Sequence, residues 1–235
     1  PLRPWLSTPF GIILEPLARR GYFAQVEDVS VEATKALLAN PAVGHVHVTG
    51  ALKTAQAIHA TLQKAHPKLS SDQIKSMITS ELGCATPQIL DDGVYTELEI
   101  KHAAQSIAFG KKANGGCNCL SSQVVVLPKR WAQKDAFRAK LYEELKRQPT
   151  TPCYYPGSVE RKAGIIEKCE QAGSKCTTVV ADSVSKEIKV SEADQVVVVE
   201  CGTPGEKGYD NTPLLAEAFG PVLAIVEMDN GDAGD

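Results

Sequence analysis

The sequence predicts an α/β protein built on a parallel sheet. Short runs rich in β-branched residues alternate along the chain with longer segments whose apolar residues recur at helical spacing, an order typical of parallel sheets covered by helices. The most β-prone run, 195–200, is apolar at nearly every position, as expected for a strand buried on both faces. With 235 residues, of which 43% are hydrophobic and 23% charged, the chain is long enough to form a sizeable globular core.

The first part of the chain, 1–80, alternates helices with strands. Apolar residues at helical spacing predict a helix that stops at Gly21, and Ser30 is well suited to cap the next helix. A β-rich run that ends at Gly50 follows, and then a segment of good helix formers. The helices expected here are 11–21, 31–40, 51–65 and 71–77, and the strands are 22–26 and 45–50. We expect the rest of the polar segment 67–80 to be loop.

The second part of the chain alternates in the same way. A long helix leads into the glycine-rich turn Asn114-Gly115-Gly116, and 133–147 has the clear apolar stripe of an amphipathic helix. The expected helices are 95–112, 133–147 and 158–172, and the expected strands are 87–90, 124–127, 177–180 and 195–200. We expect the acidic, glycine-containing residues 229–235 to form a flexible tail.

Charge and hydropathy argue against several classes of partner. The formal net charge is −3 and the basic residues are scattered, so we expect no nucleic-acid-binding face. No apolar run approaches the roughly 20 residues that a membrane helix needs. The first residues lack the layout of a signal peptide. We therefore expect a soluble, cytoplasmic protein without a membrane partner.

The seven cysteines are expected to be reduced thiols. An odd count in a mid-sized chain without a secretory signal argues against a disulfide framework. Cys117 and Cys119 have a spacing that could suggest metal ligands, but zinc normally takes three or four protein ligands, and no histidine lies near Cys119 in the sequence. We therefore expect no metal site.

Two segments carry chemistry that the residues themselves indicate. Cys119 follows glycines, and a thiolate held beside backbone N–H groups can attack a carbonyl carbon while its own N–H stabilises the oxyanion. Thr49-Gly50 closes a strand and opens a helix, where free N–H groups and the helix dipole favour a phosphate. Taken alone, Cys119 is more often a small buried apolar residue, and Thr49-Gly50 is a common dipeptide.

Four segments in a fixed order resemble the aldehyde dehydrogenase superfamily. They are Val46-His47-Val48-Thr49-Gly50, Ser80-Glu81-Leu82-Gly83, Asn114-Gly115-Gly116-Cys117-Asn118-Cys119 and Glu217-Ala218-Phe219-Gly220-Pro221-Val222. The third is similar to the family's Asn-x-Gly-x-x-Cys segment, which implies that Cys119 is the nucleophile and Cys117 a bystander. The second is similar to the family's Glu-Leu-Gly segment, which implies that Glu81 is the general base that activates the hydrolytic water. The presence of this glutamate favours a carboxylic acid as the product.

The resemblance also implies a cofactor, NAD or NADP. Thr49, Gly50 and Ala51 would contact its diphosphate through the backbone, although Ala51 stands where the family usually has serine, so that a hydroxyl contact is lost. Glu217 would accept hydrogen bonds from the nicotinamide ribose, and Phe219 would pack near the cofactor. The substrate would be a small aldehyde that the sequence does not identify.

The resemblance covers nearly the whole chain, while the chain covers only part of the family fold. It implies a partial Rossmann-like cofactor domain over 1–82 and an α/β catalytic domain of the aldehyde dehydrogenase type over 83–228. The family's oxyanion-hole asparagine, its ribose-binding lysine and its C-terminal strand cannot be assigned here. A homo-oligomer is therefore expected only if the full-length chain is longer.

Two other classes of function stay open. A catalytically inactive or truncated homologue would keep the fold as a binding or interaction module, and would bind cofactor without turnover. A cysteine-rich redox or metal-binding domain would share the α/β pattern by chance, an alternative motivated by Cys84, Cys117 and Cys119. Metal analysis of the purified protein would identify the second alternative.

Overall fold

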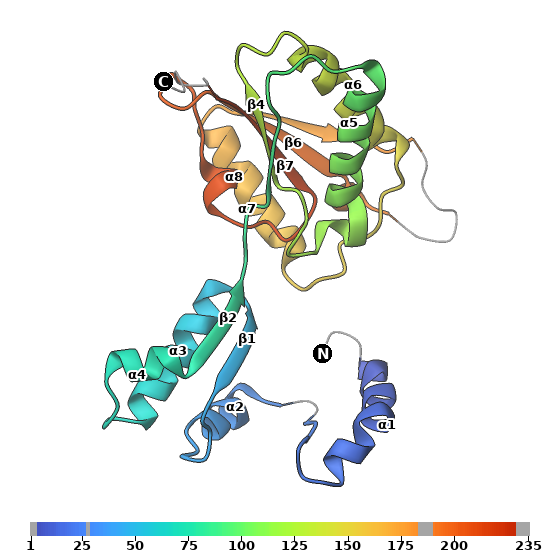
Figure 1. Ribbon diagram of the computed structural model, residues 1–235. Coiled ribbons are helices and arrows are strands. Elements are labelled where there is room, and N and C mark those ends of the chain that lie inside the picture. The colour runs from blue at the N-terminus through green and yellow to red at the C-terminus, as the bar shows by residue number, and fades with distance from the viewer. Residues whose placement is uncertain (1–3, 27–28, 183–189, 229–235) are drawn as a thin grey trace. The chain divides into compact units, whose positions relative to one another are not determined.

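The computed structural model describes residues 4–26, 29–182 and 190–228 (Figure 1). The chain divides into two compact units, an N-terminal unit, Pro1–Leu82, and a C-terminal unit, Gly83–Asp235. Both contain parallel strands joined through helices, so the predicted α/β class is confirmed. The expected acidic tail, 229–235, lies outside the described residues.

The N-terminal unit is built on a two-stranded parallel sheet. Its elements are η1 (Pro4–Leu6), α1 (Ser7–Ala18), α2 (Val31–Leu38), β1 (Val46–Gly50), α3 (Leu52–Ala65), α4 (Ser71–Ser76) and β2 (Ile78–Leu82). β1 and β2 pair along their full length, and α3 and α4 connect them. The hydrophobic cluster of this unit has three buried members, Leu38, Leu62 and Ile74. The sheet is therefore supported by one small core.

Three expectations for this unit can be compared with the structure. The predicted cap is confirmed, because the Ser30 hydroxyl accepts a hydrogen bond from the Ala33 N–H at 3.1 Å. The predicted strand 22–26 is wrong: the segment is irregular, and Tyr22 and Val26 are 78% and 68% exposed. The sequence analysis also predicted a loop up to residue 80. Residues 78–80 instead form the first part of β2. The central residues of β2, 79–81, are all polar and exposed, so pairing with β1, and not a pattern of burial, defines this strand.

The C-terminal unit is built on a five-stranded sheet with the order β3-β4-β7-β6-β5. Its elements are β3 (Pro87–Ile89), α5 (Glu97–Lys112), η2 (Ala113–Gly116), β4 (Val124–Pro128), α6 (Lys134–Arg147), α7 (Ser158–Gln171), β5 (Lys175–Val179), η3 (Glu192–Asp194), β6 (Val196–Gly202), α8 (Thr212–Leu215) and β7 (Val222–Met228). Four strands are parallel as expected, but β5 runs antiparallel to β6. An antiparallel strand can follow its neighbour without a crossover connection. The alternation of helices and strands in the sequence therefore does not by itself show that neighbouring strands are parallel.

Alternate residues of the central strands build two cores on opposite faces of this sheet. Val125 and Leu223 belong to the cluster that contains the apolar residues of α5 and α6. Their neighbours Val124 and Val222 belong to the cluster that contains Ile165 of α7. Figure 1 shows α5 and α6 on one side of the sheet and α7 and α8 on the other. Since successive strand side chains point to opposite faces, the apolar runs in the sequence follow from burial on both sides.

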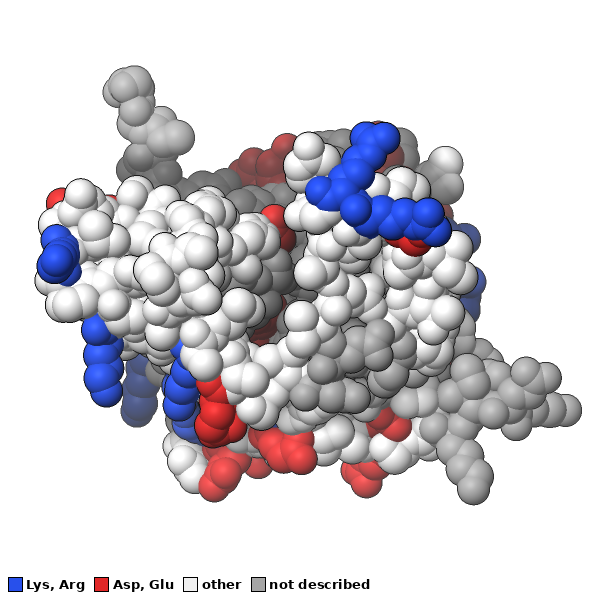
Figure 2. Space-filling view, turned by 90° about the horizontal axis from the view of Figure 1, so that it is seen from below, with Lys and Arg blue, Asp and Glu red and all other residues white. Residues whose placement is uncertain are grey.

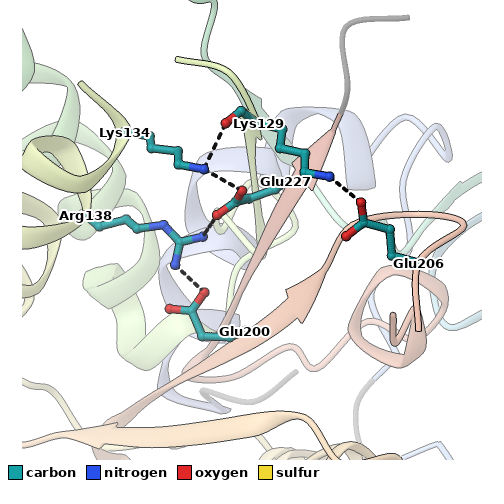
Figure 3. Close-up of polar contacts among 6 residues, drawn as sticks. All are labelled: Lys129, Lys134, Arg138, Glu200, Glu206 and Glu227. Atoms are coloured by element: carbon teal, nitrogen blue, oxygen red, sulfur yellow. Dashed lines mark hydrogen bonds and ion pairs between the residues drawn. The ribbon is translucent and has the colours of Figure 1, made fainter. Parts of the chain in front are cut away.

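Ion pairs join α6 to the ends of β6 and β7 (Figure 3). Arg138 contacts Glu200 at 2.6 Å and Glu227 at 2.8 Å, and the Lys134 ammonium lies 2.8 Å from the second oxygen of Glu227. The four side chains are only 20–24% exposed. Because a connected, partly buried network loses less side-chain entropy per pair than isolated surface pairs, it helps to fix α6 on the sheet.

Two surface properties bear on partners. Among the described residues, no helix combines the length and apolarity needed to cross a bilayer. On the face shown in Figure 2, Lys and Arg side chains lie in separate places and do not form one continuous patch. The scattered basic residues of the sequence therefore also look scattered on this face of the fold.

Candidate active site

A tight turn at the end of α5 carries the predicted nucleophile. Asn114, Gly115 and Gly116 have φ values of 53°, 63° and 73°, so three successive residues adopt the left-handed region. A side-chain carbon at Gly115 would lie 2.6 Å from the Pro152 carbonyl oxygen, and one at Gly116 would lie 2.5 Å from that of Gly220. The glycines are therefore needed for conformation and for close backbone packing. We call 113–119 the cysteine loop.

Cys119 lies at the end of the cysteine loop and is exposed. Its sulfur is 3.6 Å from Asn118 Oδ1, and its carbonyl oxygen accepts a hydrogen bond from the Thr86 hydroxyl at 3.0 Å. Asn118 Oδ1 also accepts the N–H of Leu120 at 2.8 Å. The backbone on both sides of Cys119 is thus held, while the thiol itself is open to a small molecule.

Cys117 occupies a different environment. Its thiol is buried, lies 3.3 Å from the Ser158 hydroxyl, and is 3.8 Å from the Gly115 carbonyl oxygen. The Cys153 sulfur lies 3.5 Å from the same oxygen. A hydrogen bond from the Cys153 thiol lowers the pKa of Cys117 to about 6, and the same contact raises the pKa of Cys153. The sequence interpretation set Cys117 aside, yet the lowered pKa belongs to this thiol.

The half-buried Glu217 points at the start of the C-terminal unit. Its carboxylate packs so closely on the backbone of Gly83 that a side-chain carbon there would overlap it. Burial raises the pKa of Glu217, against the opposing effect of a hydrogen bond from the Cys84 N–H. Because Cys84 and Thr86 also contact the carbonyl of Cys119, the segment 83–86 lies between the predicted nucleophile and the predicted ribose ligand.

Phe219 has a backbone conformation that is unusual for a bulky residue. Its φ is 44°, and its ring meets the Tyr155 ring edge-on, with the centroids 4.7 Å apart. Arg161 lies 5.8 Å from the centre of Tyr155, and its Nε donates to the Ala218 carbonyl at 3.1 Å. A non-glycine residue with positive φ is held there by its surroundings, and these contacts fix the half-buried ring.

Two buried polar side chains that the sequence analysis missed also support the turn at 217–221. The Gln123 amide donates to the carbonyl oxygens of Pro213 and Ala216, at 2.6 and 2.8 Å, and accepts the Ala218 N–H at 2.7 Å. Lys111 donates to the Gly220 carbonyl at 3.1 Å, and complete burial lowers the pKa of its ammonium to about 7. In the sequence, the only hint of a role for these residues is their position: Lys111 lies just before the cysteine loop and Gln123 just after it.

The remaining predicted residues lie in the N-terminal unit. Thr49 and Glu81 are direct neighbours across the β1–β2 pair, and both are exposed. Gly50 ends β1, and Ala51 occupies the N-cap position of α3 without a side-chain cap. Uncapped N–H groups at a helix start remain available for an anion. The structure thus brings Thr49, Gly50, Ala51 and Glu81 together in one unit, and Cys119, Glu217 and Phe219 in the other.

Metal ligands do not gather in the part of the chain that the structure describes. There, no group of three or more His, Cys, Asp or Glu side chains is placed to hold an ion. In the C-terminal unit, the polar groups around the cysteine loop include thiols, the Glu217 carboxylate, the buried Lys111 ammonium and backbone N–H groups.

Comparison with known proteins gives a consistent picture. A model of the aldehyde dehydrogenase family matches residues 19–234. Vanillin dehydrogenase of Pseudomonas fluorescens is 25% identical over 206 residues, which are 87% of this chain and 39% of that protein. A solved salicylaldehyde dehydrogenase from Pseudomonas putida G7, complexed with salicylaldehyde, is 19% identical with a TM-score of 0.61, and the match covers 88% of this chain and 39% of that one.

A second solved structure, of an indole-3-acetaldehyde dehydrogenase complexed with NAD+, is 18% identical with a TM-score of 0.60, and the match covers 84% of this chain and 38% of that one. Likeness at this level of identity shows a shared fold. The chain spans about two fifths of the length of these relatives.

Proposed function

The chain belongs to the aldehyde dehydrogenase family, and from this premise we propose that it oxidises an aldehyde to a carboxylic acid, with NAD or NADP, through a thioester on Cys119. The observation that carries the proposal is the exposed thiol of Cys119, three residues after a turn of three left-handed residues that ends at Gly116. Such a turn fixes the backbone around the sulfur and leaves the sulfur accessible. An accessible thiol on a fixed loop is what nucleophilic attack on a carbonyl requires.

The first step falls to Cys119. Its thiolate attacks the aldehyde carbon, and its own backbone N–H is the nearest donor for the oxyanion that forms. Loss of hydride from this adduct leaves a thioester on the same sulfur. Asn118 and Thr86, which hold the loop on either side, keep the sulfur in place while the substrate reacts.

The second step needs water and a base. We assign it to Glu81, which is exposed on β2 next to Thr49. Its carboxylate takes a proton from water, and the hydroxide attacks the thioester to release a carboxylic acid. This assignment takes the base from the N-terminal unit and the nucleophile from the C-terminal unit.

The residues present fit a nicotinamide dinucleotide, which would supply the hydride acceptor when bound. The uncapped start of α3, at Gly50 and Ala51, offers N–H groups to a diphosphate. Glu217 offers a half-buried carboxylate to ribose hydroxyls, and Phe219 offers a fixed aromatic ring. In this proposal, residues 1–82 are part of a dinucleotide-binding domain and residues 83–228 are the catalytic domain.

Two relatives are named for aromatic aldehydes, vanillin and salicylaldehyde, so aromatic aldehydes are the first substrates to test. The test of the nucleophile is brief exposure to an activated acyl ester, followed by peptide mass spectrometry. We expect fast acylation of Cys119, loss of that acylation and of turnover in Cys119→Ala, and retained cofactor binding. Cys176→Ala is the control, because this half-buried thiol on β5 contacts none of the proposed site residues. Scattered labelling, or unchanged turnover in Cys119→Ala, would remove the assignment.

A second candidate function is that of a cofactor-binding protein without turnover. It is considered because the two residues assigned to catalysis, Glu81 and Cys119, belong to separate compact units. It predicts that NAD or NADP raises the melting temperature while no aldehyde is oxidised.

A further inference from the structure

Two thiols outside the proposed catalytic step share one carbonyl oxygen. The sulfur of Cys117 lies 3.8 Å from the Gly115 oxygen and that of Cys153 lies 3.5 Å from it. Cys117 is only 4% exposed, whereas Cys153 is half-buried. The two residues come from segments that are distant in sequence, the cysteine loop and the connection between α6 and α7. The fold therefore builds a dithiol that the sequence spacing does not show.

The backbones that carry the two thiols are held against each other. The Gly115 N–H donates to the Thr151 hydroxyl at 2.7 Å, and the same hydroxyl donates to the Lys112 carbonyl at 3.2 Å. The Cys153 N–H donates to Asp194 Oδ1 at 2.7 Å. The two segments are thus held side by side, and the Cys153 thiol donates a hydrogen bond to Cys117.

The contacts of Cys117 favour its thiolate. The Cys153 thiol is its first donor, the Ser158 hydroxyl is a second, and the positive charge of Arg161 acts in the same direction. A thiolate is the form of cysteine that reacts with oxidants, and a nearby second thiol turns the product into a disulfide. Cys153 already lies in the position of that second thiol.

We propose that Cys117 and Cys153 form a redox-active pair, in which a hydroperoxide oxidises Cys117 and Cys153 resolves the product as an intramolecular disulfide. The Cys117 thiolate attacks one oxygen of hydrogen peroxide, the O–O bond breaks, and a sulfenic acid and hydroxide form; the hydroxide takes up the proton that the Cys117 thiol had lost and leaves as water. The Cys153 sulfur then attacks the sulfenic sulfur, the S–O bond breaks, and a second water leaves. In total, two thiols lose two electrons and two protons, and hydrogen peroxide is reduced to two waters.

The pairing has a chemical consequence for the loop. A sulfenic acid without a partner thiol is oxidised further to sulfinic acid, which thiols do not reverse, whereas a disulfide is restored by reduction. Cys153 thus protects the cysteine loop from irreversible damage, two residues away from Cys119. This property belongs to the pair itself and does not depend on aldehyde oxidation.

The test treats the reduced full chain with hydrogen peroxide, blocks the remaining thiols, and digests with trypsin. Cleavage after Lys112, Lys129, Arg147 and Arg161 gives peptides 113–129 and 148–161. We expect these two peptides to be joined by a bond that dithiothreitol breaks, and fragment ions to place the bond on Cys117 and not on Cys119. Oxidation of both sulfurs without a link, or a link through Cys119, would overturn the proposal.

Variants sharpen the result. In Cys153→Ser we expect loss of the link and accumulation of sulfinic acid on Cys117. In Cys119→Ser the link should persist, and Cys176→Ser serves as the matched control, because this half-buried thiol lies outside the pair. Equal sulfinic acid on Cys117 in wild type and Cys153→Ser would show that Cys153 resolves nothing. The wild-type fragment ions decide the proposal even if a variant fails to fold.

Discussion

The two units of this chain contain the same alternation of strands and helices but differ in what they bury. The C-terminal unit covers both faces of a five-stranded sheet with separate apolar clusters. The N-terminal unit has one pair of strands and a cluster with three buried members. A two-stranded sheet is marginal on its own. Local pattern thus produces similar elements in both units, while only one of them has the core that makes a fold stable.

The surface of the N-terminal unit shows the same difference. Many of its large apolar side chains are more than 40% exposed: Trp5, Phe10, Ile12, Ile13, Leu17, Tyr22, Val26, Val29, Val31, Leu37 and Leu52. Within the described residues, β1 and β2 pair only with each other, so each has an unpaired edge. Exposed apolar residues and free strand edges favour association. This unit therefore has a surface suited to further protein contacts.

The largest effect is expected from separating the two units. Residues 83–228 alone should fold and melt in one cooperative transition, whereas residues 1–82 alone should show helix by circular dichroism but no cooperative melting. Calorimetry of the two pieces measures this directly. A sharp melting transition of residues 1–82 would contradict the expected difference in stability between the two units.

A matched pair of core substitutions should give the next largest effect. Leu141 and Leu62 are both fully buried, the first in the C-terminal unit and the second in the N-terminal unit. We expect Leu141→Ala to lower the free energy of unfolding of the main transition by about 2–5 kcal/mol. Leu62→Ala should leave that transition unchanged and reduce helicity instead. Denaturant unfolding followed by circular dichroism distinguishes the two, and equal effects would mean that the units unfold together.

The smallest effect concerns pH. Within the described residues, the C-terminal unit buries Lys111, whereas no Lys, Arg, Asp or Glu side chain of the N-terminal unit is buried. Burial lowers the pKa of Lys111 from 10.5 to about 7, so the unfolded chain binds the extra proton between these values. The stability of the main transition should therefore rise with pH between about 7 and 8, by up to about 1.4 kcal/mol per pH unit. At higher pH the rise is opposed, because folding raises the pKa of the Cys153, Cys169 and Cys201 thiols.

The control for this prediction is a pair of variants on the same helix. Lys111→Met should remove most of the rise, although Lys112, with a pKa lowered by burial to about 8, keeps a smaller one. Lys101→Met, at an exposed position of α5, should leave the slope unchanged. A flat profile in the wild type would show that the Lys111 ammonium is solvated.

Much of the fold could be predicted because period and capping are local signals. The Ser30 cap and the apolar run of β6 can each be recognised from a short stretch of neighbouring residues. β2 could not be found in this way, because its polar centre at 79–81 becomes a strand only through pairing with β1. The direction of β5 was missed for a related reason, since strand pairing is a long-range property.

The sequence predicted candidate site residues but not the residues that support them. Motifs pointed to Cys119 and Glu217, whose roles are still proposals. The residues that hold the site were not visible in the sequence: Lys111, Gln123 and Arg161 act through buried hydrogen bonds to carbonyl groups far along the chain. Cys153 was missed because its partner Cys117 is 36 positions away.

The contact between Gly116 and Gly220 limits how this protein can be altered. The backbone of the cysteine loop touches the turn that follows Phe219 with no room for one side-chain carbon. An insertion or deletion in either loop must therefore be matched by a change in the other. In a combinatorial library, position 116 should stay glycine, whereas a side-chain carbon at 220 would meet nothing closer than the Ser158 carbonyl oxygen at 3.5 Å, so new substrate preferences are better sought by randomising residues other than 116.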